Sequence, residues 1–378
     1  MFSRLKKRIK TFFYDKNLFL DDKKIILESS PDYSDNTKYV FDELIKRGIN
    51  KDCRIYWATS GSTSKPQRVP NVFSVRKGSF HYKLIHNTAK FIVDSNDYVL
   101  KTRKNQFRIH LTHGMALKMP YEYASMAGEF NYCSLLSEYF LPIYTKLYDP
   151  DKSKYAITGL PRNDGLTNDL HVSGKKPGAK YILWLPTFRN HKNKKATQTG
   201  IFYPYCMPCV RTKKELMTLN TLLANHSIIL VVKPHPAEDV SGLKSIKLSN
   251  IQLFSESIFD DSAMQLYDAL KDADALITDY SSVYYDYLLL KRPIGLSIPD
   301  LNEYTSIYDL TEKNFKNFIK GSYIESFDDL LSFISNFSSG KLKFGKDMEW
   351  ALNRYHKFRD GKSSSRVVDI IEKEMGRK

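Results

Sequence analysis

The sequence predicts an α/β protein with two domains, each built around a parallel sheet. Short apolar runs that are typical of buried strands, such as KKIILES at 23–29, alternate with amphipathic stretches that are typical of helices. The alternation stops in a polar stretch rich in Gly and Lys, TNDLHVSGKKPGAK, and then starts afresh. Because the two halves are of similar size, we expect this stretch to link two domains of ordinary length.

Each half is expected to contain several strands, with helices between them. In the first half the strands lie at 23–29, 54–59, 91–96 and 106–114, and a helix lies at 36–48, where Gly48 closes it. In the second half the strands lie at 181–187, 227–236, 275–280 and 293–297, and the helices at 211–226, 263–273 and 283–291. The segment after Gly345 is charged and helical in character. Ligands of doubly wound sheets bind at the carboxyl ends of the strands, so polar residues there are candidates for a site.

The chain carries a large positive charge, with 58 Lys and Arg against 42 Asp and Glu and a formal net charge of +16. Such a surplus favours an anionic partner, namely a nucleic acid, an anionic membrane surface or a phosphorylated substrate; a generally lysine-rich, solvated surface is the alternative. No apolar run is long enough to span a membrane, and the basic start, MFSRLKKRIKTFF, lacks the apolar stretch of a secretory signal. We therefore expect the protein to remain inside the cell.

The four cysteines form no pattern for disulfides or zinc. Cys206 and Cys209 make a CxxC pair, but Cys53 and Cys133 stand alone, whereas a structural zinc site takes four ligands, usually from two such pairs. We expect buried or incidental thiols, and we find no other cluster with metal-ligand spacing.

The strongest functional pattern is ALITDYSSVYYDYLLLK, which begins at Ala275. An apolar strand ends in Thr278 and Asp279, then Ser281 and Ser282 follow, and a helix begins directly. Serines in this place can simply cap the helix. The same geometry offers free backbone N–H groups, two hydroxyls and the positive end of a helix dipole to a phosphate.

Two further strands end in histidine. In VVKPHP an apolar strand delivers Lys233 and His235, and the prolines on either side of the histidine hold it where it can donate to a phosphate or act as an acid. In LTHG, His113 ends a strand before a glycine that permits a tight turn. His110 lies three positions earlier, so on a regular strand the two histidines point to opposite faces and are not expected to pair. Taken singly, an ordinary histidine satisfied by its neighbours explains the VVKPHP motif at least as well and is the better explanation of the LTHG motif.

Two arginines lie in motifs on either side of the predicted linker. Arg162 in GLPRND and Arg189 in LPTFR can hold phosphates through forked hydrogen bonds. Either can equally be a surface charge at a domain boundary, and the sequence leaves both explanations open.

Together and in this order, five segments resemble the CDP-glycerol glycerophosphotransferase family, the teichoic acid primases and polymerases. The segments read THGMALK, GLPRND, LPTFR, VKPHP and ITDYSS, and the resemblance extends from Leu111 to Ser306, with weaker similarity in IILESSPDYSDN near Glu28. It implies an α/β fold of the GT-B type, in which two Rossmann-like domains face a cleft. We place the N-terminal acceptor domain at 1–165, with C-terminal helices at 345–378 packing back, and the nucleotide-donor domain at 176–344.

The resemblance also implies roles for individual residues. His113 matches the base that activates the acceptor hydroxyl, and His235 matches a histidine that contacts the donor's phosphates. The other residues that match donor-phosphate or nucleotide-binding positions are Arg189, Lys233, Thr278, Asp279, Ser281 and Ser282, and those that match the acceptor side or the cleft are Lys118, Arg162, Asn163 and Asp164. No metal or cofactor is implied, because cationic side chains and backbone donors can stabilise the charge of such a transfer.

The function implied by the resemblance is transfer of glycerol phosphate, or a related polyol phosphate, from CDP-glycerol or CDP-ribitol to a cell-surface polymer or a lipid-linked acceptor, with release of CMP. A GT-B glycosyltransferase that uses a nucleotide sugar is the alternative enzyme. A basic nucleic-acid-binding protein is less favoured, because aromatic residues are not interleaved with Lys and Arg in a recognisable pattern. The basic, aromatic head before Asp15 can hold a cytoplasmic protein peripherally on the inner face of the plasma membrane; a frayed basic terminus explains it equally well, and the sequence leaves both explanations open.

Two departures from the family pattern concern the acceptor side. Thr112 stands where the family usually has tryptophan, and Met115 and Ala116 replace a small residue and a proline. These positions lie beside His113, so the sequence leaves the identity of the acceptor open.

Overall fold

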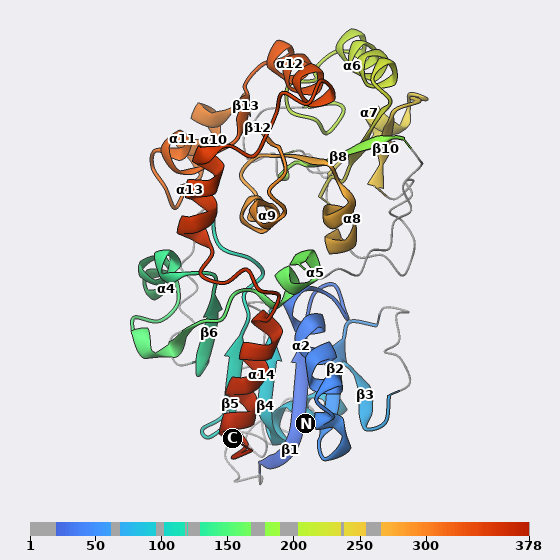
Figure 1. The fold of residues 1–378 in the computed structure, drawn as a ribbon. Helices are drawn as coiled ribbons and strands as arrows, with labels where there is room; N and C mark the ends of the chain where they lie inside the picture. Colours follow the sequence, from blue (N-terminus) through green and yellow to red (C-terminus); the bar gives the residue numbers. More distant parts are fainter. Residues whose placement is uncertain are drawn as a thin grey trace. The chain divides into compact units, whose positions relative to one another are not determined.

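The chain divides into two compact units, which are described separately (Figure 1). The computed structural model describes residues 20–61, 69–95, 102–117, 119, 129–167, 178–189, 203–235, 238–254 and 266–377 of the 378-residue chain. Unit 1 comprises residues 1–115, 124–164 and 356–378, and unit 2 comprises residues 116–123 and 165–355. The assignment of acceptor and donor roles to domains at 1–165 and 176–344 stays a prediction.

Unit 1 is built on a Rossmann-like sheet of seven parallel strands in the order β3-β2-β1-β4-β5-β6-β7. The chain reverses its direction across the sheet between β1 and β4, which is the place where ligands of such sheets bind. Ile25 and Leu27 of β1 belong to the core on one face and Ile26 to the core on the other, as expected of a central strand buried on both sides. The strands are β1 (Asp21–Glu28), β2 (Arg54–Thr59), β3 (Val72–Arg76), β4 (Ala89–Asp94), β5 (Phe107–His110), β6 (Tyr132–Leu135) and β7 (Tyr155–Ile157).

The helices of unit 1 cover both faces of its sheet. The α-helices are α2 (Asp35–Lys46), α3 (Phe80–Thr88), α4 (Leu141–Leu147) and α14 (Ser363–Glu374), and the 3-10 turns are η1 (Ile49–Lys51), η2 (Glu138–Phe140), η3 (Lys152–Lys154) and η4 (Pro161–Asn163). A short helix, α5 (Asp164–Thr167), begins in unit 1 and ends in unit 2.

The C-terminal helix α14 completes the core of unit 1. Val367, Val368 and Ile371 are fully buried in the cluster that α2 forms with the sheet, and α14 lies beside α2 in Figure 1. At the rim of this contact, Nη1 of Arg47 in the turn after α2 donates to Oδ1 of Asp369 at 2.7 Å. The end of the chain is therefore an integral part of the first unit and not an appendage.

Unit 2 is built on six parallel strands in the order β10-β9-β8-β11-β12-β13. Here the reversal lies between β8 and β11. The strands are β8 (Lys180–Leu185), β9 (Ile228–Val232), β10 (Ile251–Leu253), β11 (Ala275–Thr278), β12 (Ile294–Ser297) and β13 (Ser322–Ile324). The helices are α6 (Lys213–Asn225), α7 (Ser241–Lys244), α8 (Leu266–Asp272), α9 (Val283–Tyr287) with its continuation η7 (Leu288–Leu290), α10 (Leu301–Ile307), α11 (Phe315–Phe318), α12 (Phe327–Ser338) and α13 (Lys346–Tyr355).

Local sequence signals explain where several of these elements begin and end. Helix α6 starts with a capping box, in which Thr212 and Glu215 satisfy each other's backbone N–H groups. The strand expected at 106–114 ends earlier, at His110, because Thr112 adopts a left-handed φ of 57° that no regular strand contains. The strand expected at 227–236 ends at Val232, two residues before a proline that cannot donate to a ladder. The sequence analysis missed the short strands β3, β6, β7, β10 and β13.

The cysteines are free and buried, as the sequence suggested. Burial raises the pKa of the Cys206 and Cys209 thiols to about 12, so both stay protonated near neutral pH. Among the residues that the structure describes, no group of three or more His, Cys, Asp or Glu side chains could hold a metal ion. Within the same residues, no helix has the length and apolar composition needed to cross a membrane. The basic head before Asp15 lies outside them.

The contribution of α14 can be tested by truncating one of its buried side chains. Ile371→Ala should lower the free energy of unfolding by about 2–5 kcal/mol, because it removes packing from a fully buried position. Lys373→Ala, on the exposed face of the same helix, should change it by no more than about 0.5 kcal/mol. Urea unfolding measures both values, and equal effects of the two substitutions would show that α14 is not part of the core.

Candidate active site

Four neighbouring strand ends bring the predicted donor-side motifs to one edge of unit 2. Strands β9, β8, β11 and β12 lie side by side in that order, and the reversal of the chain lies between the middle two. Because the strands are parallel, the segments that follow their carboxyl ends lie along the same edge. These segments are 186–189, 233–235, 279–282 and 298–300.

Arg189 is buried at this edge between two carboxylates. Its Nε and Nη2 donate to Asp300 at 2.6 and 3.1 Å, and its Nη1 donates to Asp279 at 2.5 Å and to the carbonyl of Thr187 at 3.0 Å. The side chain is only 2% exposed. Burial by itself lowers the pKa of the guanidinium, but Asp279 and Asp300 outweigh it and hold that pKa well above its usual value. Arg189 is therefore a fixed cation that joins the ends of β8, β11 and β12.

Two tyrosine rings pack against the ion pairs of Arg189. The rings of Tyr280 and Tyr304 stack with their centroids 3.7 Å apart, and the guanidinium carbon of Arg189 lies 5.4 and 5.8 Å from the two centroids. The hydroxyl of Tyr280 also donates to Asp300 at 3.1 Å. Stacked aromatic faces of this kind favour a cation and exclude solvent, so the charges act on each other at short range.

Lys233, directly after β9, is a cation of a different kind. Its backbone N–H continues the strand ladder to the carbonyl of Trp184 at 2.9 Å, and its ammonium lies 5.6 Å from the ring centroid of Phe254. Burial lowers the pKa of this lysine, and no carboxylate among the described residues opposes that effect. A bound anion would favour the charged form, so the position suits a phosphate.

The remaining polar groups of the edge lie on both sides of β8. The exposed His235 packs its ring on Phe188, with the centroids 5.3 Å apart, which joins the segments after β8 and β9. After β11, the hydroxyl of Ser281 accepts a long bond of 3.4 Å from the N–H of Val283. Ser282 occupies the N-cap position of α9 but makes no side-chain cap bond there. Helix capping thus uses Ser281 weakly and leaves the Ser282 hydroxyl for another partner.

In unit 1, His113 stands at the end of β5 beside a buried aspartate. Its Nδ1 lies 2.5 Å from Oδ2 of Asp35, the first residue of α2. The imidazole is 67% exposed, whereas the carboxylate is only 6% exposed. Burial by itself raises the pKa of Asp35, but Arg162 and His113 outweigh it and hold that pKa at about 2. An ionised carboxylate therefore anchors an exposed histidine.

Arg162 and Asn36 fix this arrangement from two sides. Nη1 of Arg162 donates to Oδ1 of Asp35 at 2.9 Å and to the carbonyl of His113 at 3.1 Å. The amide of Asn36 donates to the carbonyl of Thr112 at 3.0 Å, and its oxygen accepts from the backbone N–H of Arg162 at 3.0 Å. The start of α2, the end of β5 and the turn η4 are thus joined around one imidazole. His110 takes no part, because it is buried against Asp94 at 2.7 Å.

Residues 10–373 match the protein family described as CDP-glycerol:poly(glycerophosphate) glycerophosphotransferase. The chain belongs to this family. The predicted family is thus confirmed. The enzyme class and the transfer of a polyol phosphate are confirmed as far as they are common to the family.

Individual relatives agree with this placement. The teichoic acid ribitol-phosphate polymerase TarK of Staphylococcus aureus is 26% identical over 94% of this chain and 70% of its own length. The teichoic acid glycerol-phosphate primase of Bacillus subtilis is 28% identical over 65% of this chain and 58% of its own length. This chain therefore spans only part of each relative. The solved structure of the wall teichoic acid polymerase TagF aligns with a TM-score of 0.77 and 20% identity over 99% of this chain and 98% of that one, which confirms the GT-B type of fold.

The predicted donor-side residues fall into two groups. Lys233, His235, Ser281 and Ser282 are at least partly exposed at the edge of the sheet. Arg189 and Asp279 are buried against each other, and the Thr278 hydroxyl donates to the carbonyl of Leu185 at 2.9 Å. Contact of this second group with a donor phosphate would require a buried network to open. The difference in exposure between the two groups results from contacts between residues far apart in the sequence, which the sequence pattern does not reveal.

The acceptor-side predictions divide in a similar way. Arg162 lies beside His113, whereas Asp164 caps α14 by accepting from the backbone N–H groups of Ser363 and Ser364 at 2.9 and 2.7 Å. The side-chain amide of Asn163 is buried and has no hydrogen-bond partner in the described part of the chain. Lys118 lies outside the described residues.

Sequence reasoning missed Asp35, Asn36 and Asp300, all of which have a clear place in the structure. The signal for the first two was the segment SPDYSDN, in which polar residues follow the apolar β1 at the reversal of the sheet. Asp300 follows β12 in the same manner. Each is equally explained as an ordinary polar residue near the start of a helix, so the pattern alone does not distinguish it.

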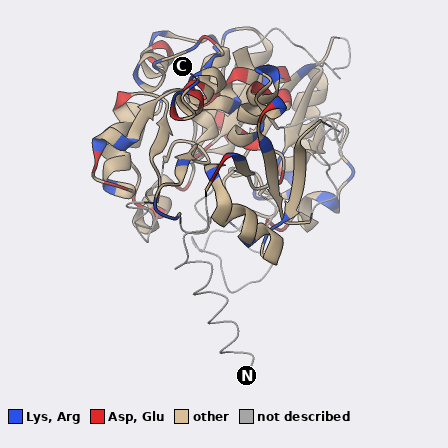
Figure 2. Ribbon diagram, turned by 90° about the horizontal axis from the view of Figure 1, so that it is seen from below, with Lys and Arg blue, Asp and Glu red and all other residues tan. Residues whose placement is uncertain are grey.

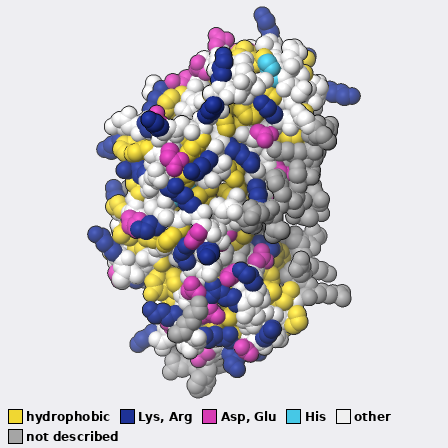
Figure 3. Space-filling model, viewed as in Figure 1, with side chains coloured by type: hydrophobic (Ala, Val, Ile, Leu, Met, Phe, Trp, Pro, Cys, Tyr) yellow, Lys and Arg dark blue, Asp and Glu magenta, His cyan; other side chains and the backbone are white. Residues whose placement is uncertain are grey.

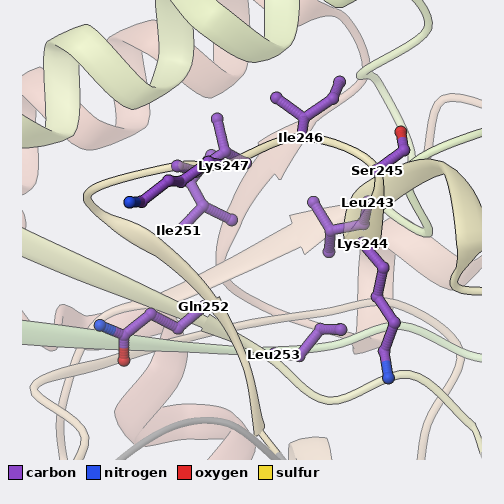
Figure 4. A pocket seen from close by; sticks show the side chains of 9 residues that line it. Leu243, Lys244, Ser245, Ile246, Lys247, Ile251, Gln252 and Leu253 are labelled. Atoms are coloured by element: carbon purple, nitrogen blue, oxygen red, sulfur yellow. The ribbon is translucent and has the colours of Figure 1, made fainter.

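A pocket of about 470 Å³ at the edge strand β10 is a poorer candidate (Figure 4). It is lined by residues 243–248 and 251–253. It contains Lys244 and Lys247, but Figure 4 shows their side chains pointing in different directions, so they do not converge on one ligand. The pocket is also separated from the reversal of the sheet by β9 and β8.

The dependence of unit 2 on its buried arginine can be measured directly. Arg189→Met should lower the free energy of unfolding by roughly 3–5 kcal/mol, because Asp279 and Asp300 lose the cation that pairs with them. The matched control is Arg211→Met, since Arg211 also lies over Tyr203 but is exposed; its effect should stay within about 0.5 kcal/mol. Chemical denaturation of both variants tests this, and equal stability of the two would contradict the role given to Arg189.

Proposed function

We propose that the protein transfers a polyol phosphate, glycerol phosphate or ribitol phosphate, from a CDP-linked donor to a teichoic-acid-type polymer or its lipid-linked precursor, and releases CMP. The observation that carries the proposal is the cationic edge of unit 2, where Lys233 is half-buried without an anionic partner among the described residues. Membership of the glycerophosphotransferase family supports the choice of a CDP-linked donor. A structure of a TagF variant soaked with CDPG is among the structural neighbours.

The donor side consists of side chains from two strand ends. Lys233 and His235 follow β9, while Ser281 and Ser282 follow β11, and β8 separates the two strands. Neighbouring strands lie about 4.8 Å apart, so the ends of β9 and β11 lie roughly 10 Å apart. A diphosphate that reaches both ends would receive charge from the lysine and hydrogen bonds from the histidine and the hydroxyls. These groups would stabilise the negative charge that CMP carries as it leaves.

Arg189, Asp279 and Thr278 take a supporting role in this proposal. Because each is bonded inside the protein, they hold the turn that carries Ser281 and Ser282 and need not touch the donor. A turn that is fixed before the donor binds requires no reorganisation during the reaction, which is how fixed donors lower a barrier.

On the acceptor side, His113 is the proposed base. It takes the proton of an acceptor hydroxyl while the oxygen attacks the phosphorus next to the polyol, and the bond from that phosphorus to CMP breaks. The ring is exposed enough to meet a polymer hydroxyl, and its orientation is fixed by Asp35. Asn163, whose amide lacks a partner in the described part of the chain, is a further acceptor-side candidate.

The proposal also includes the identity of the polyol and the location of the protein in the cell. The relatives include both a ribitol-phosphate polymerase and a glycerol-phosphate primase, so the proposal covers both polyols. The net charge of +16 supports a peripheral position on the anionic inner face of the plasma membrane. Basic and acidic residues are mixed along the ribbon in Figure 2, and on the face that Figure 3 shows Lys and Arg side chains are interspersed with Asp and Glu. This mixture on the visible face is not the basic patch typical of a nucleic-acid-binding protein.

A donor screen tests the reaction class. Incubation with CDP-glycerol or CDP-ribitol and a lipid-linked or polymeric acceptor should release CMP, and the release should depend on the acceptor because its hydroxyl is the nucleophile. Chromatography of the nucleotide products measures this. Release of UDP or GDP from a nucleotide sugar, with no CMP from either CDP-polyol, would replace the proposal by a glycosyltransferase.

The division of labour between the units predicts that two kinds of variant fail differently. His235→Ala and Ser282→Ala should weaken CDP-polyol binding about ten- to hundredfold, because each removes a hydrogen bond to a charged group worth roughly 1.5–3 kcal/mol. His113→Ala should abolish transfer and leave donor binding nearly intact.

Calorimetry with the donor alone decides between these outcomes. Lys244→Ala, in the pocket at the edge strand of the same unit, is the control and should bind the donor like the unmodified protein. Loss of donor affinity in folded His113→Ala that is as large as in His235→Ala would contradict a separate acceptor base.

A further inference from the structure

The geometry points to Asp35 as the positioning residue of His113: it fixes the tautomer in which Nε2 is the basic atom. This inference rests on the proposed function, in which His113 is the acceptor-side base. Neither the five motifs nor the family match assigns a role to Asp35. The contact itself is the 2.5 Å approach of Nδ1 of His113 to Oδ2 of Asp35.

The protonation state of Asp35 decides where the proton of the neutral imidazole lies. Asp35 is buried, yet Arg162 and His113 hold its pKa at about 2 against the opposing effect of burial. An ionised carboxylate accepts hydrogen bonds and cannot donate. The hydrogen in the short contact therefore belongs to Nδ1 of His113. The lone pair of the neutral ring is then on Nε2, which Asp35 leaves available for a substrate hydroxyl.

Arg162 keeps the proton on the histidine during the reaction. It donates to Oδ1 of Asp35 at 2.9 Å, on the oxygen that does not face His113. When Nε2 takes the acceptor's proton, the new oxygen–phosphorus bond forms and the bond to CMP breaks, and the positive charge stays on the imidazolium. Asp35 stabilises that charge and remains ionised, because the guanidinium opposes its protonation.

The backbone around Asp35 and His113 has an unfavourable conformation that specific hydrogen bonds maintain. Asp35 and Thr112 have φ values of 57°, in the left-handed region that residues with a side chain seldom adopt. The hydrogen bonds from Asn36 to the Thr112 carbonyl, and from Arg162 to the His113 carbonyl, hold both segments in place. Backbone of this kind persists only where the surroundings determine it, and here the result is a fixed imidazole.

A purely structural role for Asp35 predicts a different outcome on substitution. Asp35 is the first residue of α2, so a merely structural carboxylate would interact with the helix N-terminus. Asp35→Asn would then change stability alone. In the positioning role, Arg162 keeps the amide oxygen of Asn on its own side, and the amide NH2 faces Nδ1. Nδ1 must then accept a hydrogen bond, so the ring proton moves to Nε2 and the base is lost.

The test combines nitrogen NMR with kinetics on the full chain. The protein has nine histidines, and His113→Gln assigns the signals of the one in question. With 15N-labelled histidine, neutral His113 should carry its proton on Nδ1 in the unmodified protein and on Nε2 in Asp35→Asn. The rate constant kcat for CMP release should fall at least about 100-fold in Asp35→Asn, because the general base is lost, while KM for the donor should stay within about twofold.

Asp32→Asn is the matched control. Asp32 lies in the same loop, is as buried as Asp35, and accepts from the N–H and hydroxyl of Ser60 at 2.8 and 2.9 Å, so it is equally structural but does not touch His113. It should leave the His113 tautomer and kcat unchanged.

The outcomes separate this inference from the proposed function. Neutral His113 with its proton on Nε2 in the folded, unmodified protein overturns the inference, even when Asp35→Asn fails to fold. Unchanged kcat in folded Asp35→Asn overturns it as well, with the proposed function left standing. Absence of CMP release from every CDP-polyol, together with the Nδ1 proton found as expected, would reject the function and leave the pairing of the two residues in place.

Discussion

In unit 2, the buried guanidinium of Arg189 ties together the segments that follow three neighbouring strands. It belongs to the end of β8 and is bonded to Asp279 after β11 and Asp300 after β12. Removing one member of such a group leaves an uncompensated buried charge, which destabilises the fold by several kcal/mol. The three segments therefore cannot shift independently. The turn with Ser281 and Ser282 has a defined place before any ligand arrives, and the proposed donor edge depends on that fact.

Unit 1 uses the same kind of interaction for another purpose. Arg162 binds a buried carboxylate, that of Asp35, and the carboxylate in turn holds an exposed imidazole. In both units an arginine that resembles a phosphate ligand in the sequence is bonded to aspartate inside the protein. Among the predicted site residues, His113 and His235 are exposed, Ser282 makes no side-chain cap bond, and Lys233 has no carboxylate beside it in the described part of the chain. The groups proposed to react are thus more exposed than the groups proposed to support them, as expected when a rigid frame presents a few side chains.

This separation also explains how the chain accommodates threonine where the family usually has tryptophan. Thr112 contributes its backbone to the arrangement around His113, because its carbonyl accepts from Asn36 and its left-handed φ turns the chain at the end of β5. The whole residue is only 1% exposed. The histidine is held through the backbone and through Asp35, so the exchanged side chain leaves these hydrogen bonds in place. Threonine in place of tryptophan therefore changes the side chain next to His113 more than it changes the orientation of the imidazole.

The sequence by itself determined the two α/β units, most of their long strands and the segments proposed to carry the chemistry. Apolar runs of adequate length predict buried strands, and strand-end motifs in parallel sheets must gather at one edge, so His113, Lys233 and His235 were found by pattern. The strands β7 and β3 were missed because their sequences, YAI and VFSVR, contain too few consecutive apolar residues to indicate a buried strand.

Only the tertiary structure decided which charged residues are exposed and which are paired. Arg189 and Lys233 look alike in their motifs, yet one is enclosed between two aspartates and the other is not. Asp35 and His113 are 78 positions apart, and Asp279 and Arg189 are 90 positions apart. Contacts over such distances arise from the packing of helices and strand ends, and a local pattern contains no information about them. The partner of an ionisable group fixes its protonation state and its freedom to bind, so its role is settled only when the chain has folded.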